Sequence, residues 1–205
     1  MMGMDSSALL ENAYHLARIG RYNDALAAYD SVLAADPAST AALEQKGNVF
    51  YSLGRHEDAI ASYDRALALN PLLPTVWYEK GYTLRKIGRF DEALACFERA
   101  LSLDPDYSIA LANKGYSLNA LGRHKEALPC FDRILADSRN NIRAMTGRGI
   151  ALIGLGRNEE ALAAFDEAVG LNPINSFVWQ QRAEALRRLG RTVEAEESLR
   201  HVSGR

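Results

Sequence analysis

A glycine followed by an arginine recurs at one fixed interval along almost the whole chain, and this spacing limits the possible folds more than any other feature. Each glycine lies 34 residues after the one before it, and the pairs are Gly20-Arg21, Gly54-Arg55, Gly88-Arg89, Gly122-Arg123, Gly156-Arg157 and Gly190-Arg191. A constant period of this length indicates one supersecondary unit that is copied and stacked. Such a chain does not form an ordinary globule, because each unit contacts only the units beside it.

Placing the recurrent glycine at position 15 of each unit divides the chain into six repeats. After an N-terminal extension of residues 1–5, the repeats are residues 6–39, 40–73, 74–107, 108–141, 142–175 and the shorter 176–205. Positions 4, 8, 11 and 14 of a repeat fall on one face of a helix. Position 8 always holds a very small residue: Ala13, Gly47, Gly81, Gly115, Gly149 and Ala183. We expect this residue to let a second backbone approach closely.

The glycine at position 15 is typical of a helix C-cap, and a second helix follows it. The apolar line of the second helix includes an alanine at position 20 in every repeat and, at position 24 of the first five, an aromatic residue: Tyr29, Tyr63, Phe97, Phe131 and Phe165. Four repeats end in Asp-Pro or Asn-Pro, which stops the second helix. Each repeat is therefore predicted to form a helix, a tight turn and a second helix, and these pairs must stack to bury both faces.

Two repeats depart from the pattern. Repeat 4 has no closing proline, and its second helix contains Pro129, which either is tolerated or bends the helix locally. In repeat 6, Glu196 and Ser203 replace the apolar residues that should face a following repeat. We therefore expect repeat 6 to be a C-terminal cap and the array to be complete. Repeat 1 has no equally polar edge, so self-association through the N-terminal repeat is left open.

Composition and charge argue against several classes of protein. Apolar residues make up 48% of the chain, which suits a continuous core and not disorder. No apolar run reaches the roughly 18 residues of a membrane span, and the N-terminus lacks the pattern of a signal peptide, so we expect a cytoplasmic protein. The net charge of −2 is spread over interspersed acids and bases, which gives no footprint for DNA or RNA.

The motifs of common enzymes and cofactor sites are absent from the sequence. It contains no phosphate-binding loop, no HExxH, no GxSxG and no CxxC. We expect no catalysis, no metal site and no cofactor. Cys96 and Cys130 occupy the same position in neighbouring repeats, too far apart for a disulfide, and are interpreted as small buried thiols. The recurrent arginines are interpreted as solubilising residues of the turn.

The repeat resembles the tetratricopeptide repeat (TPR), and the resemblance covers residues 6–205. The family pattern is W-x2-L-G-x2-Y, A-x3-F and P on a 34-residue period. Repeat 3 matches it at Trp77, Gly81, Leu84, Ala93, Phe97 and Pro105. A basic residue, Lys80 in this repeat, replaces the family leucine in repeats 2 to 6. The resemblance implies an all-α, right-handed superhelical solenoid of antiparallel helix pairs.

The resemblance also implies that the first helices line a concave face, chiefly through positions 2, 5, 6, 9, 12 and 13. The residues predicted to contact a peptide or protein there are Tyr14, Gln45, Asn48, Tyr51, Tyr78, Glu79, Tyr82, Arg85, Asn113, Tyr116, Asn119 and Arg143. Tyrosine supplies rigid contact area with a hydroxyl, and asparagine amides bond an extended backbone. The alternative interpretation is that the tyrosines only cover helix stems.

The predicted function is therefore that of an interaction scaffold or adaptor, whose concave groove binds a peptide segment or a partner protein. A helical-repeat nucleic-acid-binding protein is the alternative function. It needs a basic concave face, whereas Glu44, Glu79 and Arg85 give this face mixed charge.

Some TPR domains hold the acidic C-terminus of heat-shock chaperones with a clamp of Lys, Arg and Asn side chains. The best-aligned positions here carry Tyr78, Tyr82, Asn113, Arg143 and Gly147, of which only Asn113 and Arg143 match the clamp. We predict that a peptide ending in Glu-Glu-Val-Asp binds no more tightly than the millimolar range in a fluorescence anisotropy titration. A micromolar dissociation constant would contradict this prediction.

Overall fold

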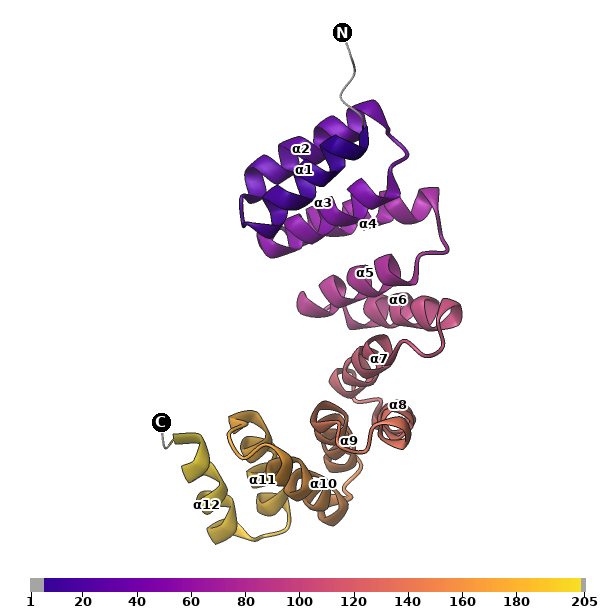
Figure 1. Ribbon diagram of the computed structural model, residues 1–205. Coiled ribbons are helices and arrows are strands. Elements are labelled where there is room, and N and C mark those ends of the chain that lie inside the picture. The colour runs from indigo at the N-terminus through magenta and orange to yellow at the C-terminus, as the bar shows by residue number, and fades with distance from the viewer. Residues whose placement is uncertain (1–5, 204–205) are drawn as a thin grey trace. The chain divides into compact units, whose positions relative to one another are not determined.

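The computed structural model describes residues 6–203, and this part of the chain consists of twelve helices with no β-strand (Figure 1). Twelve helices are consistent with six repeats of two helices each. The chain divides into two compact units, which we call the N-terminal unit (residues 1–106) and the C-terminal unit (residues 107–205). Each is described by itself. The predicted N-terminal extension of residues 1–5 lies outside the described residues.

The N-terminal unit contains three helix pairs stacked in chain order. Its helices are α1 (Ser6–Arg18), α2 (Tyr22–Ala35), α3 (Thr40–Ser52), α4 (His56–Leu69), α5 (Pro74–Lys86) and α6 (Phe90–Leu103). Within the unit, α2 packs on α3 and α4 packs on α5. The first helices α1, α3 and α5 also contact one another in sequence, whereas the described parts of α2, α4 and α6 do not. The first helices therefore form the more closely spaced side of the unit, which we call its inner side.

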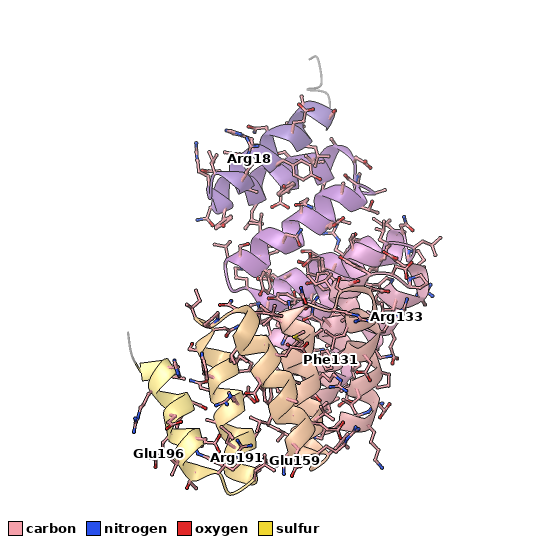
Figure 2. The ribbon with its side chains drawn as sticks, turned by 60° about the horizontal axis from the view of Figure 1, so that its bottom comes forward. Arg18, Phe131, Arg133, Glu159, Arg191 and Glu196 are labelled. Atoms are coloured by element: carbon pink, nitrogen blue, oxygen red, sulfur yellow. The ribbon has the colours of Figure 1, made fainter. Side chains whose placement is uncertain are left out.

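The C-terminal unit repeats this arrangement. Its helices are α7 (Ser108–Ala120), α8 (His124–Asp137), α9 (Ile142–Gly154), α10 (Asn158–Leu171), α11 (Ser176–Arg188) and α12 (Thr192–Ser203). Its inner side is formed by α7, α9 and α11, which contact one another in order. The helix α8 continues unbroken through Pro129. Glu196 lies exposed on α12 (Figure 2), and the side chain of Ser203 is not among those described.

Every first helix ends in the same turn, and glycine makes that turn possible. The recurrent glycines have φ between 72° and 80°, as the C-cap prediction requires. In repeat 2, the N–H of Gly54 donates to the carbonyl of Tyr51 and the N–H of Arg55 donates to the carbonyl of Phe50, both at 2.9 Å. These two bonds form a Schellman motif, which satisfies carbonyls that the helix end leaves free.

The small residue at position 8 makes room for the aromatic ring at position 24. A Cβ atom added at Gly47 would lie 2.4 Å from the ring of Tyr63, and one added at Gly149 would lie 2.5 Å from that of Phe165. Both rings are fully buried. The close neighbour at this position is therefore a ring of the same repeat, and not a second backbone as the sequence analysis expected.

The arginine that follows each glycine forms an ion pair with an acid three residues later. Arg55 Nε lies 2.7 Å from Asp58, and Arg157 Nε lies 2.6 Å from Glu160. All six repeats have this pair. It holds the start of the second helix against the turn, so these arginines do more than solubilise the surface. Each pair is exposed to solvent, so its contribution to the stability of the fold is small.

A second recurrent ion pair joins consecutive repeats inside each unit. It uses the basic residue that replaces the family leucine at position 7. In the N-terminal unit, Lys80 Nζ lies 2.5 Å from Asp64 on the preceding second helix. In the C-terminal unit, Arg182 Nε lies 2.6 Å from Asp166 in the same relation. The substitution therefore links neighbouring repeats without occupying a core position.

The structure shows the environment of the two cysteines and whether any described helix could span a membrane. Cys96 and Cys130 are buried, as predicted, and burial raises the pKa of the Cys96 thiol to about 11. Among the helices of residues 6–203, none has both the length and the apolar character that a membrane span requires.

Two glycines of repeat 5 separate the effect of backbone conformation from that of space. Gly156 has φ of 74° and Gly170 lies inside α10, yet an added Cβ would meet nothing within 4 Å at either residue. We predict that Gly156→Ala lowers the free energy of unfolding by about 1–2 kcal/mol, because alanine is strained in the left-handed region. Gly170→Ala should raise it by about 0.5–1 kcal/mol through helix propensity. Urea unfolding followed by circular dichroism measures both, and equal midpoints would contradict the argument.

Candidate functional site

The predicted contact residues are divided between the inner sides of the two units. The N-terminal unit carries Tyr14, Gln45, Asn48, Tyr51, Tyr78, Glu79, Tyr82 and Arg85, and the C-terminal unit carries Asn113, Tyr116, Asn119 and Arg143. Their role in binding remains a prediction. The structure shows which of these side chains face solvent and which are used inside the fold.

Three tyrosines of α3 and α5 form a continuous row, which we call the tyrosine ladder (Tyr51, Tyr82 and Tyr78). The ring centroids of Tyr51 and Tyr82 are 5.6 Å apart, and those of Tyr82 and Tyr78 are 6.0 Å apart. Tyr51 and Tyr82 are half-buried, so their rings are open to a ligand. Tyr78 is only 8% exposed and packs on Phe97, so it belongs to the core as well as to the ladder.

Two cations lie over the middle ring of the ladder. The Arg85 guanidinium is 5.3 Å and the Lys86 ammonium 5.5 Å from the centroid of Tyr82. Burial acts to raise the pKa of Tyr82, but its hydrogen bond with Tyr51 and the charges of Lys86 and Arg85 outweigh burial and lower that pKa. The Nε atom of Arg85 is buried without a hydrogen-bond partner in the described part of the chain. The ladder therefore carries positive charge at the C-terminal end of α5.

Two carboxyl groups lie nearer the N-terminal ends of the same helices. Glu44 on α3 and Glu79 on α5 are half-buried, and burial raises the pKa of each. The negative charge of Glu44 raises the pKa of Glu79 further, while a hydrogen bond with Thr75 partly offsets the shift at Glu44. Glu44 is absent from the predicted set, although its position 5 belongs to the predicted concave face. The inner side of the N-terminal unit thus has acids at one edge and bases at the other.

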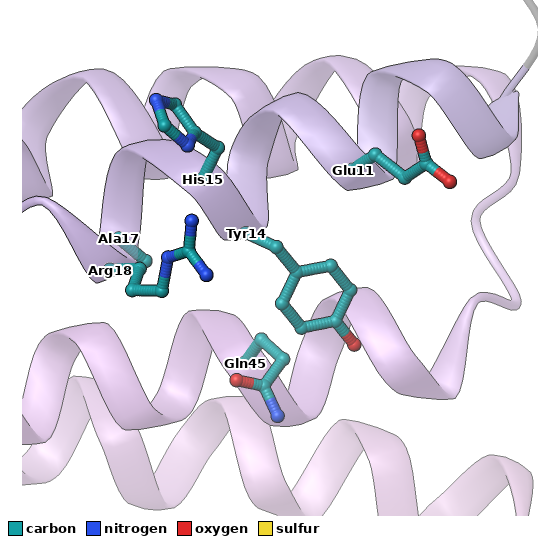
Figure 3. A pocket seen from close by; sticks show the side chains of 6 residues that line it. All are labelled: Glu11, Tyr14, His15, Ala17, Arg18 and Gln45. Carbon is teal, nitrogen blue, oxygen red and sulfur yellow. The ribbon is translucent and has the colours of Figure 1, made fainter.

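The first two repeats enclose a hollow of about 470 Å³ (Figure 3). The ring of Tyr14 on α1 reaches toward Gln45 on α3, so the hollow brings these two predicted residues together. Tyr14 is 38% exposed and packs edge-on against Tyr29, at 6.1 Å between centroids. Asn48 instead accepts a hydrogen bond from the hydroxyl of Tyr63 at 2.7 Å, so its oxygen is used inside the repeat.

In the C-terminal unit, the two predicted asparagines are structural. Asn113 is fully buried, and its Nδ2 donates to the carbonyl of Ile109 at 2.7 Å. Asn119 is 9% exposed, and its Nδ2 donates to the carbonyl of Gly147 at 2.9 Å. Their burial differs from the expectation that these positions face a ligand. The reason is that α7 packs closely on α9, so that Asn113 and Asn119 both form hydrogen bonds with groups of that helix.

Arg143 and Tyr116 hold each other in place on the same side. The Tyr116 hydroxyl donates to the carbonyl of Arg143 at 2.6 Å, and the Arg143 guanidinium lies 5.4 Å from the Tyr116 centroid. Arg143 Nη2 also donates to Asn113 Oδ1 at 3.2 Å. Both residues line a hollow of about 280 Å³ that Phe177 of α11 also borders. The sequence analysis missed Phe177, although its position 2 belongs to the predicted face.

Among the residues that the structure describes, no three side chains of His, Cys, Asp or Glu gather in a way that would hold a metal ion. The tyrosines, amide groups and unpaired charges described above give the inner sides aromatic contact area, hydrogen-bond donors and charge. Protein interfaces use these same features to bind another polypeptide.

The buried carboxyl of Glu79 allows a test of the inner side by pH. Because its pKa is higher in the folded chain, the folded state binds this proton more tightly, and the carboxylate destabilises the fold at neutral pH. We predict that Glu79→Gln raises the urea midpoint at pH 7, and that the gain disappears as the pH falls through the folded pKa toward 4.5, the unperturbed value. Glu11→Gln is the control, because Glu11 is an exposed residue of α1. A gain that does not depend on pH would contradict this account.

The chain was compared with known families and proteins. A sequence model of the tetratricopeptide repeat matches residues 10–74, 78–142 and 146–201. No curated protein sequence gives a significant match.

Several solved structures share the fold. A tetratricopeptide repeat protein from Parabacteroides merdae is 22% identical with a TM-score of 0.88, over 97% of this chain and 79% of that one. PilW, described as a widely conserved type IV pilus biogenesis factor, is 21% identical with a TM-score of 0.80, over 97% of both chains. YrrB, described as a TPR protein with an unusual peptide-binding site, is 24% identical with a TM-score of 0.77, over 85% of this chain and 90% of that one. Because the family model matches most of the sequence, the chain belongs to the tetratricopeptide repeat family.

Proposed function

We propose that this TPR protein is a non-catalytic interaction scaffold or adaptor, and that its inner side binds a peptide segment of a partner protein. The observation that carries the proposal is the tyrosine ladder. Two of its rings, Tyr51 and Tyr82, are half-buried on the inner side of the N-terminal unit, where they contact each other at an interplanar angle of 53°. Tyrosines of this kind are enriched among the residues that dominate binding energy at protein interfaces.

The charges beside the ladder support the same proposal. Recurrent ion pairs neutralise the arginine after each turn and, in this unit, the basic residues Lys46 and Lys80 at position 7. No such pair involves Glu79, Arg85 or Lys86 in the described part of the N-terminal unit. Charges that the fold does not use are available to a ligand, and their desolvation by a matched partner gives specificity.

The fold is compatible with this use. YrrB has the same fold, and its description names a peptide-binding site, but the low identity extends only the fold to this chain. The mixed charge around the ladder favours a polypeptide over a nucleic acid, which requires a basic face along its path.

The test begins with peptides selected on the immobilised protein from a random display library. We predict that the double substitution Tyr51→Ala and Tyr82→Ala weakens the selected peptides by about tenfold or more, because interface tyrosines commonly contribute 2 kcal/mol or more. Affinities come from fluorescence anisotropy. Asn113 is not substituted in this test, because the hydrogen bond of its side-chain amide supports the fold.

The control is Tyr22→Ala, which removes a half-buried tyrosine from α2 of the same unit. It should leave the affinities unchanged, and the circular dichroism spectra of all variants should remain helical. Wild-type affinity in a folded ladder variant would refute the proposal. Displacement of the selected peptides by a single-stranded RNA oligonucleotide at low salt would favour the nucleic-acid alternative.

A further inference from the structure

The hollow of the C-terminal unit has an apolar wall that the fold itself does not fill. Ile142 and Thr146 of α9 and Phe177 of α11 line it, and Tyr116 of α7 closes one side. Phe177 is 48% exposed, although it is a large apolar residue. The volume of about 280 Å³ lies just below the roughly 300–1,000 Å³ that is usual for small-molecule sites. It suits one large side chain of a bound polypeptide.

Arg143 stands at the rim of this hollow as a fixed cation without an anion. Its guanidinium is held by the ring of Tyr116 and by the oxygen of Asn113. Among the described residues, no carboxylate forms an ion pair with it. By contrast, Arg188 pairs with Glu184, and Arg182 pairs with Asp166. An arginine that is pre-ordered in this way loses little entropy when it binds a carboxylate.

The remaining polar groups of the hollow also favour an acceptor. The Oδ1 atom of Asn172 accepts from the N–H of Ile174, and that of Asn175 accepts from the N–H of Val178. Their Nδ2 groups have no acceptor in the described part of the unit. The Thr146 hydroxyl is already bonded to the carbonyl of Ile142. The free groups around the hollow are therefore donors, and no acidic side chain lines it.

The net charge of the C-terminal unit is positive, as is the charge of Arg143 at the rim of the hollow. Residues 107–205 contain 14 Lys and Arg against 11 Asp and Glu, a formal charge of +3. Residues 1–106 contain 10 Lys and Arg against 15 Asp and Glu, a formal charge of −5. An acidic ligand is thus attracted to the C-terminal unit and not to the N-terminal one.

We propose that this hollow binds an extended segment of a partner protein in which a Leu or Phe stands next to an Asp or Glu. The apolar side chain enters between Ile142 and Phe177, and the neighbouring carboxylate pairs with the Arg143 guanidinium. The amide groups of Asn172 and Asn175 donate to the segment's backbone or carboxylate. The inference rests on the proposed function, since it names the partner chemistry for one of the two inner sides.

The probes are four decapeptides of Gly and Ser with acetylated and amidated ends and a central pair of Asp-Leu, Asn-Leu, Asp-Ser or Lys-Leu. Blocked ends remove the terminal carboxylate as a competing source of the charge. Their binding to the full chain is followed by NMR titration, which measures affinities into the millimolar range. We expect Asp-Leu to bind about tenfold more tightly than Asn-Leu, because a hydrogen bond to a charged group contributes about 1.5–3 kcal/mol. Lys-Leu should bind most weakly.

Two substitutions in the protein test the acidic residue and the apolar residue of the peptide motif separately. Arg143→Gln should weaken Asp-Leu about tenfold and leave Asn-Leu nearly unchanged, so that the preference for Asp disappears. Phe177→Ser, at an exposed residue, should remove the preference of the wild-type protein for Asp-Leu over Asp-Ser. Arg187→Gln is the matched control, because Arg187 is an exposed arginine of α11 outside the hollow.

The outcomes distinguish this inference from the function on which it rests. The inference would be overturned if Asp-Leu and Lys-Leu bound with equal affinity. It would also be overturned if Arg143→Gln lowered the affinities for Asp-Leu and Asn-Leu by the same factor. The absence of Asp-Leu binding would overturn it as well, even if the peptides selected on the whole protein still depend on Tyr51 and Tyr82, in which case the proposed function stands. Displacement of Asp-Leu by single-stranded RNA would reassign the hollow to a polyanion.

Discussion

The contact between a small residue at position 8 and an aromatic ring at position 24 is the interaction on which the rest of each repeat depends. Phe97, Phe131 and Phe165 are fully buried, and each lies where a side chain at the facing glycine would collide with it. The glycine costs helix propensity, of about 1 kcal/mol relative to alanine. Burial of a phenylalanine side chain contributes about 1.5–3 kcal/mol, so the exchange favours the fold. Once the two helices are held at this spacing, the short turn between them requires the left-handed backbone that only its own glycine adopts without strain.

The charges of the chain separate into those that build the array and those that the array leaves unused. The arginine after each turn recurs with the period of the repeat and pairs with an acid three residues later. At position 7, Lys46, Lys80, Arg148 and Arg182 each pair with an acid 16 residues earlier. The positions of Arg85, Lys86 and Arg143 are basic in only some repeats, and these three side chains contact tyrosine rings instead of carboxylates. Periodicity therefore distinguishes structural from available charge, because an interaction that every repeat needs must appear in every repeat, whereas a ligand touches only some of them.

The same distinction explains what the sequence could predict. The period, the glycine turns, the helix ends and the buried cysteines follow from patterns inside one repeat, and the structure confirms them. The arginine pairs of the turn were missed, although the spacing of Arg157 and Glu160 contains the signal, since residues three apart meet on a helix surface. The burial of Asn113 and Tyr78 had no such signal. It depends on packing between helices, such as the contact of Tyr78 with Phe97 and the close approach of α7 to α9, which no pattern within one helix reveals.

The two inner sides differ in a way that follows from these local facts. In the N-terminal unit, acids, tyrosines and bases follow one another along the first helices, so a segment that suits this side must present charges of both signs. In the C-terminal unit, the two asparagines are buried to hold α7 against α9, and what remains exposed is an apolar wall with a single fixed cation. One repeat pattern has thus produced two chemically distinct surfaces. The difference lies at the positions predicted to face the groove, which vary from repeat to repeat while the positions of the core and of the turn stay the same.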